Sequence, residues 1–175
     1  MYYKTILPAE HHQQLIIDCG ADTSGIGGPE WIIDEMTDRY VDISGYNNTI
    51  HDKKSRIGSA ITAIDLPDNK TILIKINEAT ILSDDANSLL STTQASYYGT
   101  IINCVPKSRG GTIPYIFKDD IYIPLNIKDG LIYTNIRKPT NEELKECETI
   151  ILTSEEPWNP EHIHEDYTIE DYEFS

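Results

Sequence analysis

Cysteine and long apolar runs are scarce in this sequence. Its 175 residues include only Cys19, Cys104 and Cys147, which lie far apart and form no Cys-x-x-Cys pair. This pattern argues against a disulfide framework and a zinc site, and it predicts reduced thiols. No apolar run approaches the roughly 18 residues that span a bilayer, and no signal-peptide pattern follows Met1. We therefore expect a soluble, cytoplasmic protein with no membrane partner, no metal and no cofactor.

Positive charge is also scarce, because 14 lysines and arginines face 29 aspartates and glutamates and the net charge is −15. An acidic surface repels phosphate backbones, so we expect no direct binding to nucleic acid. Residues 142–175 hold twelve acidic residues and one lysine, and Pro157 and Pro160 interrupt the chain there. We predict that residues 155–175 form a disordered acidic tail. His162 and His164 in this tail are expected to be solvated rather than to bind a metal.

Short apolar runs separated by turn residues make up most of the chain. The runs cover residues 14–17, 40–44, 57–64, 71–77, 79–82, 101–105, 113–117, 121–125 and 131–136. Turn-forming pairs such as Asp119–Asp120 and Asp129–Gly130 stand between them, as β-hairpins require. With 39% hydrophobic residues, the chain is expected to fold as a mainly β protein around one core.

Helix signals are few. Thr140 is followed three residues later by Glu143, which is the pattern of a capping box and predicts a short helix over residues 141–148. Residues 87–94 are a second candidate, because Leu89 and Leu90 can pack one face of a single helical turn against the core.

The run Leu15–Ile17 ends in Asp18, Cys19 and Gly20, the one Asp-x-Gly of the sequence. An aspartate on a tight turn after a buried strand is held at the edge of the core, as the catalytic acid of aspartic proteases is. That chemistry needs two carboxyls about 3 Å apart, one ionised to activate water and one protonated to polarise the scissile carbonyl. The second Asp18 would come from a symmetric partner chain. Alternatively, Asp18 is a turn residue that ends a strand.

Several segments also follow one another in an order known from one family. They are residues 18–23, 41–46, 57–60, 76–79 and 87–91, and later residues 137–140, 152–154 and 157–158. In this order they resemble the retropepsin-like protease region of copia-type retrotransposon Gag-Pol polyproteins, in particular those of diatoms and other algae. The resemblance covers roughly residues 12–160.

The resemblance implies a retropepsin-like acid protease barrel over residues 1–98, with a β-rich C-terminal extension and one or two short helices. Residues 99–138 would be the β-rich connector that precedes an integrase, and residues 139–154 a short helix and a strand. Asp18 would be the catalytic aspartate. The other implied site residues are Cys19, Gly20, Ala21, Asp22 and Thr23 in the active-site loop, Leu89, Leu90 and Ser91 bracing it, and Gly45, Tyr46 and Asn47 in a flap.

Two positions depart from the family pattern. Cys19 stands where the family has Ser or Thr, whose hydroxyl joins a hydrogen-bond network between the two loops of a dimer, and a thiol is a weaker donor. Ser91 stands where retroviral enzymes have Gly, although copia-type elements resemble this chain there. Two hypotheses follow. The chain is an aspartic endopeptidase that cleaves polyprotein peptide bonds as a homodimer, or it is an inactive, domesticated or decayed fragment that serves as a dimerising interaction module.

Overall fold

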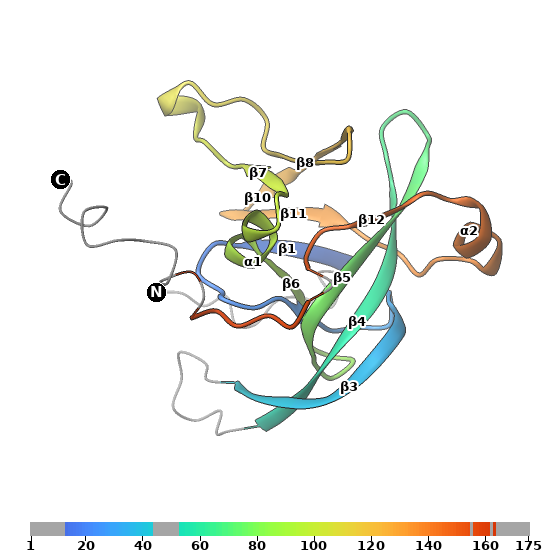
Figure 1. Ribbon diagram of the computed structural model, residues 1–175. Helices are drawn as coiled ribbons and strands as arrows, with labels where there is room; N and C mark the ends of the chain where they lie inside the picture. The colour runs from blue at the N-terminus through green and yellow to red at the C-terminus, as the bar shows by residue number, and fades with distance from the viewer. Residues whose placement is uncertain (1–12, 44–52, 155, 162, 164–175) are drawn as a thin grey trace, which may run out of the picture.

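The computed structural model describes residues 13–43, 53–154, 156–161 and 163 (Figure 1). Strands make up 49% of the structure and helical segments 12%. The mainly β prediction is therefore confirmed. No helix in the described part of the chain is long and apolar enough to cross a membrane.

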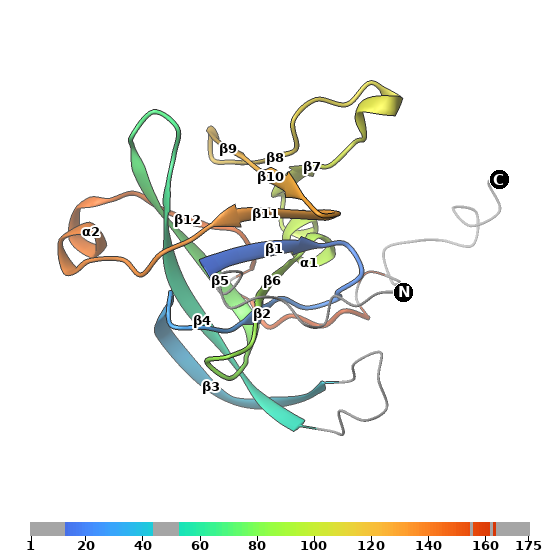
Figure 2. The same cartoon turned by 180° about the vertical axis from the view of Figure 1, so that it is seen from behind.

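Nine strands form the main sheet. They are β1 (Gln14–Asp18), β2 (Gly25–Ile26), β3 (Ile32–Ile43), β4 (Lys53–Asp65), β5 (Thr71–Ile81), β6 (Ser88–Ser91), β10 (Asn126–Lys128), β11 (Leu131–Asn135) and β12 (Thr149–Ile151). Their order is β10-β11-β1-β6-β2-β5-β4-β3, and β12 pairs in parallel with β5. In Figures 1 and 2, β11 and β1 cross the middle of the molecule while the β3–β4 pair curves beneath them.

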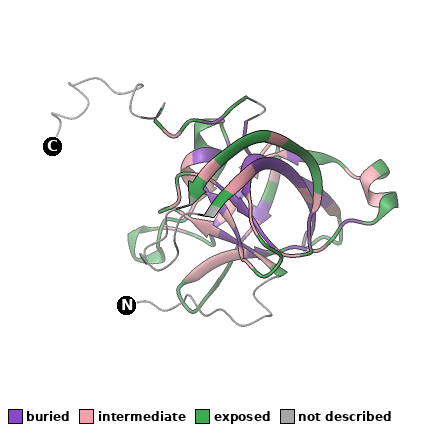
Figure 3. Ribbon diagram, turned by 90° about the horizontal axis from the view of Figure 1, so that it is seen from below, coloured by how far each residue is buried: buried purple, intermediate pink, exposed green. Residues whose placement is uncertain are grey.

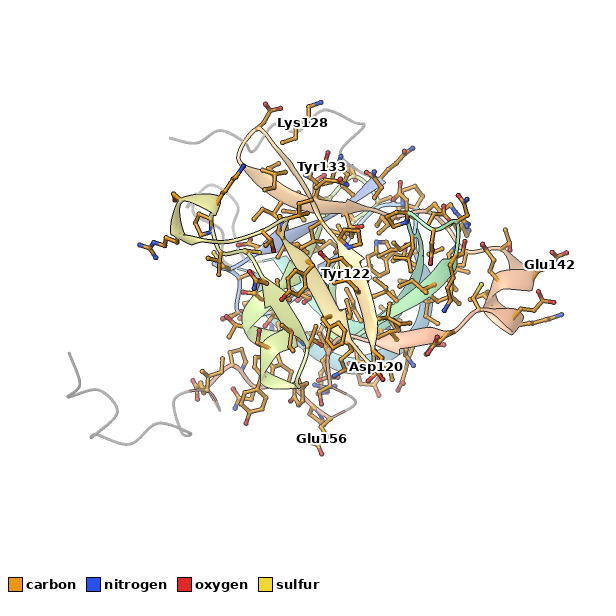
Figure 4. The ribbon with its side chains drawn as sticks, turned by 90° about the horizontal axis from the view of Figure 1, so that it is seen from above. Asp120, Tyr122, Lys128, Tyr133, Glu142 and Glu156 are labelled. Carbon is orange, nitrogen blue, oxygen red and sulfur yellow. The ribbon has the colours of Figure 1, made fainter. Side chains whose placement is uncertain are left out.

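A smaller antiparallel sheet joins β7 (Ile101–Asn103), β8 (Tyr115–Lys118) and β9 (Ile121–Pro124), and a short 3-10 turn, η2 (Lys107–Arg109), lies between β7 and β8. The β8–β9 hairpin turns at Asp119 and Asp120, with φ of 49° and 64°. Positive φ at both central residues matches the twist of the flanking strands. Tyr122 lies on the outer surface of this sheet (Figure 4).

One hydrophobic core joins the two sheets. Its fully buried members come from distant parts of the chain and include Leu15, Ile74, Leu90, Ile116 and Leu152. Figure 3 shows buried residues gathered inside the curve of the strands. The segments expected at 1–98, 99–138 and 139–154 all contribute strands to the main sheet, because β11 pairs with β1 and β12 pairs with β5.

Two helical predictions have different outcomes. The capping box at Thr140 and Glu143 is present, and it begins α2 (Asn141–Glu146), two residues shorter than expected, with Glu142 pointing away from the body (Figure 4). The expected helix over 87–94 is wrong for its first half, which is β6, and α1 (Thr92–Tyr97) follows. Paired leucines fit a strand as well as a helix, and pairing with β1 and β2 decides for the strand.

The runs 71–77 and 79–82 form one strand, β5, whose register against β4 shifts near Glu78. Glu78, the polar residue between the two runs, has a φ of 56° and marks this irregularity of the strand.

Within the range predicted to be a disordered tail, residues 155–175, the structure differs from the prediction at Trp158. Trp158 is only 7% exposed, and its backbone N–H donates to Glu78 Oε1 at 2.8 Å. The acidic composition of the region hid this large apolar side chain, whose burial outweighs the charge repulsion of its neighbours.

Arg137 joins α2 to the main sheet. Its Nε donates to Asp65 Oδ2 at 2.7 Å and its Nη1 to Glu143 Oε1 at 2.8 Å, while its backbone bridges Ala63. The guanidinium holds the pKa of Asp65 at about 2, helped by the Thr71 hydroxyl. It also holds the pKa of Glu143 at about 2, helped by the backbone of Thr140.

Stability is therefore expected to depend on pH through these two carboxyls. Their pKa values are lowered on folding, from 3.8 for Asp65 and 4.5 for Glu143. Their contribution is thus complete above about pH 5 and is lost as the pH falls towards 2. Arg137→Gln is expected to lower the urea midpoint of unfolding at pH 7. The difference between the midpoints of the variant and the wild type should be smaller at pH 3, where the two carboxyls are closer to being protonated. Solvent screens the ion pair between Arg137 and Asp65 and reduces its contribution to stability, since the Asp65 side chain is 55% exposed. An equal difference at both pH values would argue against the ion pairs.

Candidate active site

Asp18 stands at the carboxyl end of β1, a strand flanked on both sides. β11 pairs with β1 antiparallel and β6 pairs with it in parallel. Leu15 and Ile16 are buried, as expected for a strand inside a sheet. The register sets Ile17 opposite Leu90 and Asp18 opposite Ser91. The β1–β6 pairing thus brings the Asp18 loop beside residues expected to brace it.

The turn after β1 is closed by the Asp18 side chain itself. Gly20 N–H donates to Asp18 Oδ1 at 2.8 Å, a contact typical of aspartate two residues before a turn amide. Gly20 does not have a positive φ, and a Cβ there would lie 3.4 Å from Asp18 Oδ1, an ordinary contact. This turn therefore does not itself require glycine. Asp18 Oδ2 makes no hydrogen bond to any of the described residues.

Ser91 holds the loop from the opposite strand. Its Oγ donates to the Ala21 carbonyl at 2.6 Å and accepts from Gln94 N at 3.0 Å, which caps α1. Its backbone N–H donates to Ser24 Oγ at 2.9 Å. Ser91 thus fixes a carbonyl of the Asp18 loop and also caps the first turn of α1.

Leu89 and Leu90 lie on β6, which pairs with β1 on one side and β2 on the other. Leu90 is fully buried beside Ile17, and Leu89 lies opposite both Ile16 on β1 and Gly25 on β2. Because β1 and β2 flank the loop on the two sides of β6, these pairings fix where the loop begins and ends.

Gln94 is a site residue that sequence reasoning missed. Its side chain is fully buried; Oε1 accepts from Ser24 N at 2.8 Å, and Nε2 donates to the Glu78 carbonyl at 3.0 Å. It therefore ties the end of the Asp18 loop to the bend in β5. The sequence carries no local sign of this role, because both partners lie at least 16 residues away.

The remaining loop residues differ in their surroundings. Cys19 is exposed, and its thiol makes no hydrogen bond within the part of the chain that the structure describes. Desolvation raises the pKa of Cys104, just after β7, and the electrostatic effect of Cys19 raises it further. Asp22 is exposed at its side chain, while its carbonyl accepts from Trp158 Nε1 at 2.9 Å. Thr23 is half-buried.

The candidate flap residues Gly45, Tyr46 and Asn47 lie outside the described residues. The hairpin that would carry them is described up to the pair Ile43 and Lys53, and its strands are long, 12 and 13 residues.

The described carboxylates, thiols and imidazoles nowhere gather in the groups of three or more that a metal ion requires. No protein-family model, curated protein or solved structure matches this chain.

Proposed function

We propose that this chain is an aspartic endopeptidase of the retropepsin type, which cleaves polyprotein peptide bonds as a homodimer. The observation that supports this most is the support of the Asp18 loop. Side chains of Ser91, Gln94 and Trp158 hold the loop at Ala21, Ser24 and Asp22, in that order. A loop held at three points keeps a carboxyl in place, and such placement is what acid–base catalysis needs.

The chemistry requires two copies of Asp18. In the dimer, the two carboxyls share one proton because like charges about 3 Å apart do not both ionise. The ionised carboxylate takes a proton from water as the water attacks the scissile carbonyl. The protonated carboxyl donates to the carbonyl oxygen. The tetrahedral intermediate then loses its C–N bond as the first carboxyl passes the water proton to the leaving amine, and the second carboxyl takes its proton back from the hydroxyl as the carbonyl forms again. Since one chain offers one Asp-x-Gly, neither half of this machinery works alone.

A second candidate function is favoured by Cys19. If the hydroxyl of the family is needed to join the two loops, its replacement by an exposed thiol, a weaker donor, leaves the dimer without that link. The chain would then keep the fold and a dimer surface as an interaction module without peptidase activity.

Dilution of the full chain separates these functions. We expect cleavage of a broad peptide library with a specific activity that rises with protein concentration, in step with dimer formation in sedimentation. A strict monomer that retains full activity would rule out the two-chain mechanism. A stable dimer that cleaves no peptide would favour the interaction module.

A further inference from the structure

The C-terminal segment runs along β5 towards the active-site loop. β12 pairs with Leu73–Lys75, and the Leu152 N–H then donates to the Lys75 carbonyl at 3.0 Å. Thr153 Oγ1 donates to the Asn77 carbonyl at 2.7 Å and accepts from the Asn77 N–H at 2.8 Å. We name residues 149–154 and 156–158 the strap. Its hydrogen bonds advance along β5 until the strap reaches Glu78.

Trp158 ends the strap beneath the loop. Its ring meets those of Tyr97 and Tyr98 edge-on, with centroids 5.4 and 5.7 Å away. Edge-to-face rings of this kind fix each other's orientation. The indole N–H is thereby aimed at the Asp22 carbonyl, 2.9 Å away and four residues after Asp18.

Glu78 anchors the strap at a strained backbone position. Its φ of 56° is one that glycine would adopt without cost, yet a glutamate stands there. Its carboxylate receives Arg39 Nη1 at 2.7 Å and Nη2 at 2.5 Å, and Oε1 also accepts the Trp158 N–H. This hydrogen-bonded pairing raises the pKa of Arg39. The glutamate thus joins the β3–β4 hairpin to the strap at the residue whose indole holds the loop.

We propose that Trp158 is a positioning residue of the active-site loop, delivered there by the strap; its catalytic meaning rests on the proposed function. Ser91 fixes the Ala21 carbonyl and Trp158 fixes the next one, so two successive peptide units cannot rotate. The loop between them and Asp18 then has few conformations left. The hydrogen bond from Trp158 to the Asp22 carbonyl thereby keeps the Asp18 carboxyl in the position where the carboxyl of a second Asp18 would meet it.

Trp158→Phe tests this, because phenylalanine keeps a ring between the tyrosines and loses only the N–H donor. The measurements are amide hydrogen exchange at Gly20 and Ser24, and kcat and KM on a cleaved peptide. We expect both amides to exchange about five- to tenfold faster, the usual size for one lost hydrogen bond. The value of kcat should fall by a similar factor while KM and exchange in β8 stay unchanged.

Trp31→Phe is the matched control. Trp31 is also buried, and its indole N–H donates to Ser88 Oγ at 2.8 Å, away from the Asp22 carbonyl. It should leave exchange at Gly20 and Ser24 within about twofold of wild type. Glu78→Gln, which weakens the strap's anchor without touching the indole, should speed exchange at the same two amides as Trp158→Phe does.

Unchanged exchange at Gly20 and Ser24 in Trp158→Phe overturns the proposal, whatever the activity. Faster exchange with an unchanged kcat overturns it as well, because the loop order would then not serve the reaction. If the wild-type chain cleaves no peptide, the proposed function fails, and the exchange rates alone decide whether Trp158 orders the loop.

Discussion

Asp18→Asn is expected to reduce peptidase activity by at least about a thousandfold, the scale seen when an essential acid–base group is removed. An amide neither shares the proton nor activates water. The fold should be kept, because the side-chain oxygen of the introduced asparagine can still accept the Gly20 N–H that Asp18 Oδ1 accepts now. Turnover of a cleaved peptide, measured at a protein concentration where the chain is dimeric, checks this.

Asp68→Asn is a closely matched control. Asp68 Oδ1 accepts the N–H of Lys70, two residues on, in the same kind of turn, and the residue lies in the exposed β4–β5 connection. The substitution keeps that acceptor, so activity and stability should stay near wild type. Cleavage that survives Asp18→Asn, or that falls equally in both variants, would remove the aspartic mechanism. If the Asp18→Asn variant keeps its peptidase activity while thiol alkylation abolishes cleavage, Cys19 would be implicated instead.

Gln94→Leu is expected to lower the free energy of unfolding by roughly 2–4 kcal/mol. Leucine matches the glutamine in size but leaves the Ser24 N–H and the Glu78 carbonyl without their partner in a fully buried site. Each stranded buried group costs about 1–3 kcal/mol. For a chain of this length the melting temperature should fall by roughly 5–15 °C.

The neighbouring Thr93 supplies the comparison. It lies on the same helix, is half-buried and makes no side-chain hydrogen bond within the described residues. Thr93→Ala should change stability by less than about 0.5 kcal/mol. If Gln94→Leu proves as mild as Thr93→Ala in thermal unfolding, the buried amide does not hold the loop.

The features that the sequence revealed are those with local causes. The hairpin turn at Asp119 and Asp120 follows from residues that tolerate a positive φ, and α2 follows from a capping box whose two residues, Thr140 and Glu143, are three positions apart. The end of β1 at Asp18 follows from an apolar run that stops. Local patterns of this kind are readable because each group and its partner lie within a few residues of one another.

The features that it hid depend on distant partners. Trp158 and Asp22 are 136 residues apart, and β11 pairs with β1 across most of the chain. Composition suggested a free tail at Trp158 because the acidic residues around it outnumber the apolar ones. By sequence pattern alone, residues 87–94 fit a helical turn, whereas the pairing of Leu89 and Leu90 with β1 and β2 places them in a strand. Only tertiary contacts separate such alternatives.

Mixing wild-type chains with Asp18→Asn chains tests the central claim most directly, because each active site is expected to need an Asp18 from both partners. At a fixed total concentration and equal proportions, random pairing leaves about one quarter of the dimers with two aspartates. After subunit exchange, the peptidase activity should therefore be about one quarter of that of wild type alone at the same total chain concentration. A fall to one half would mean that each chain carries a complete active site, and the two-chain mechanism would be wrong.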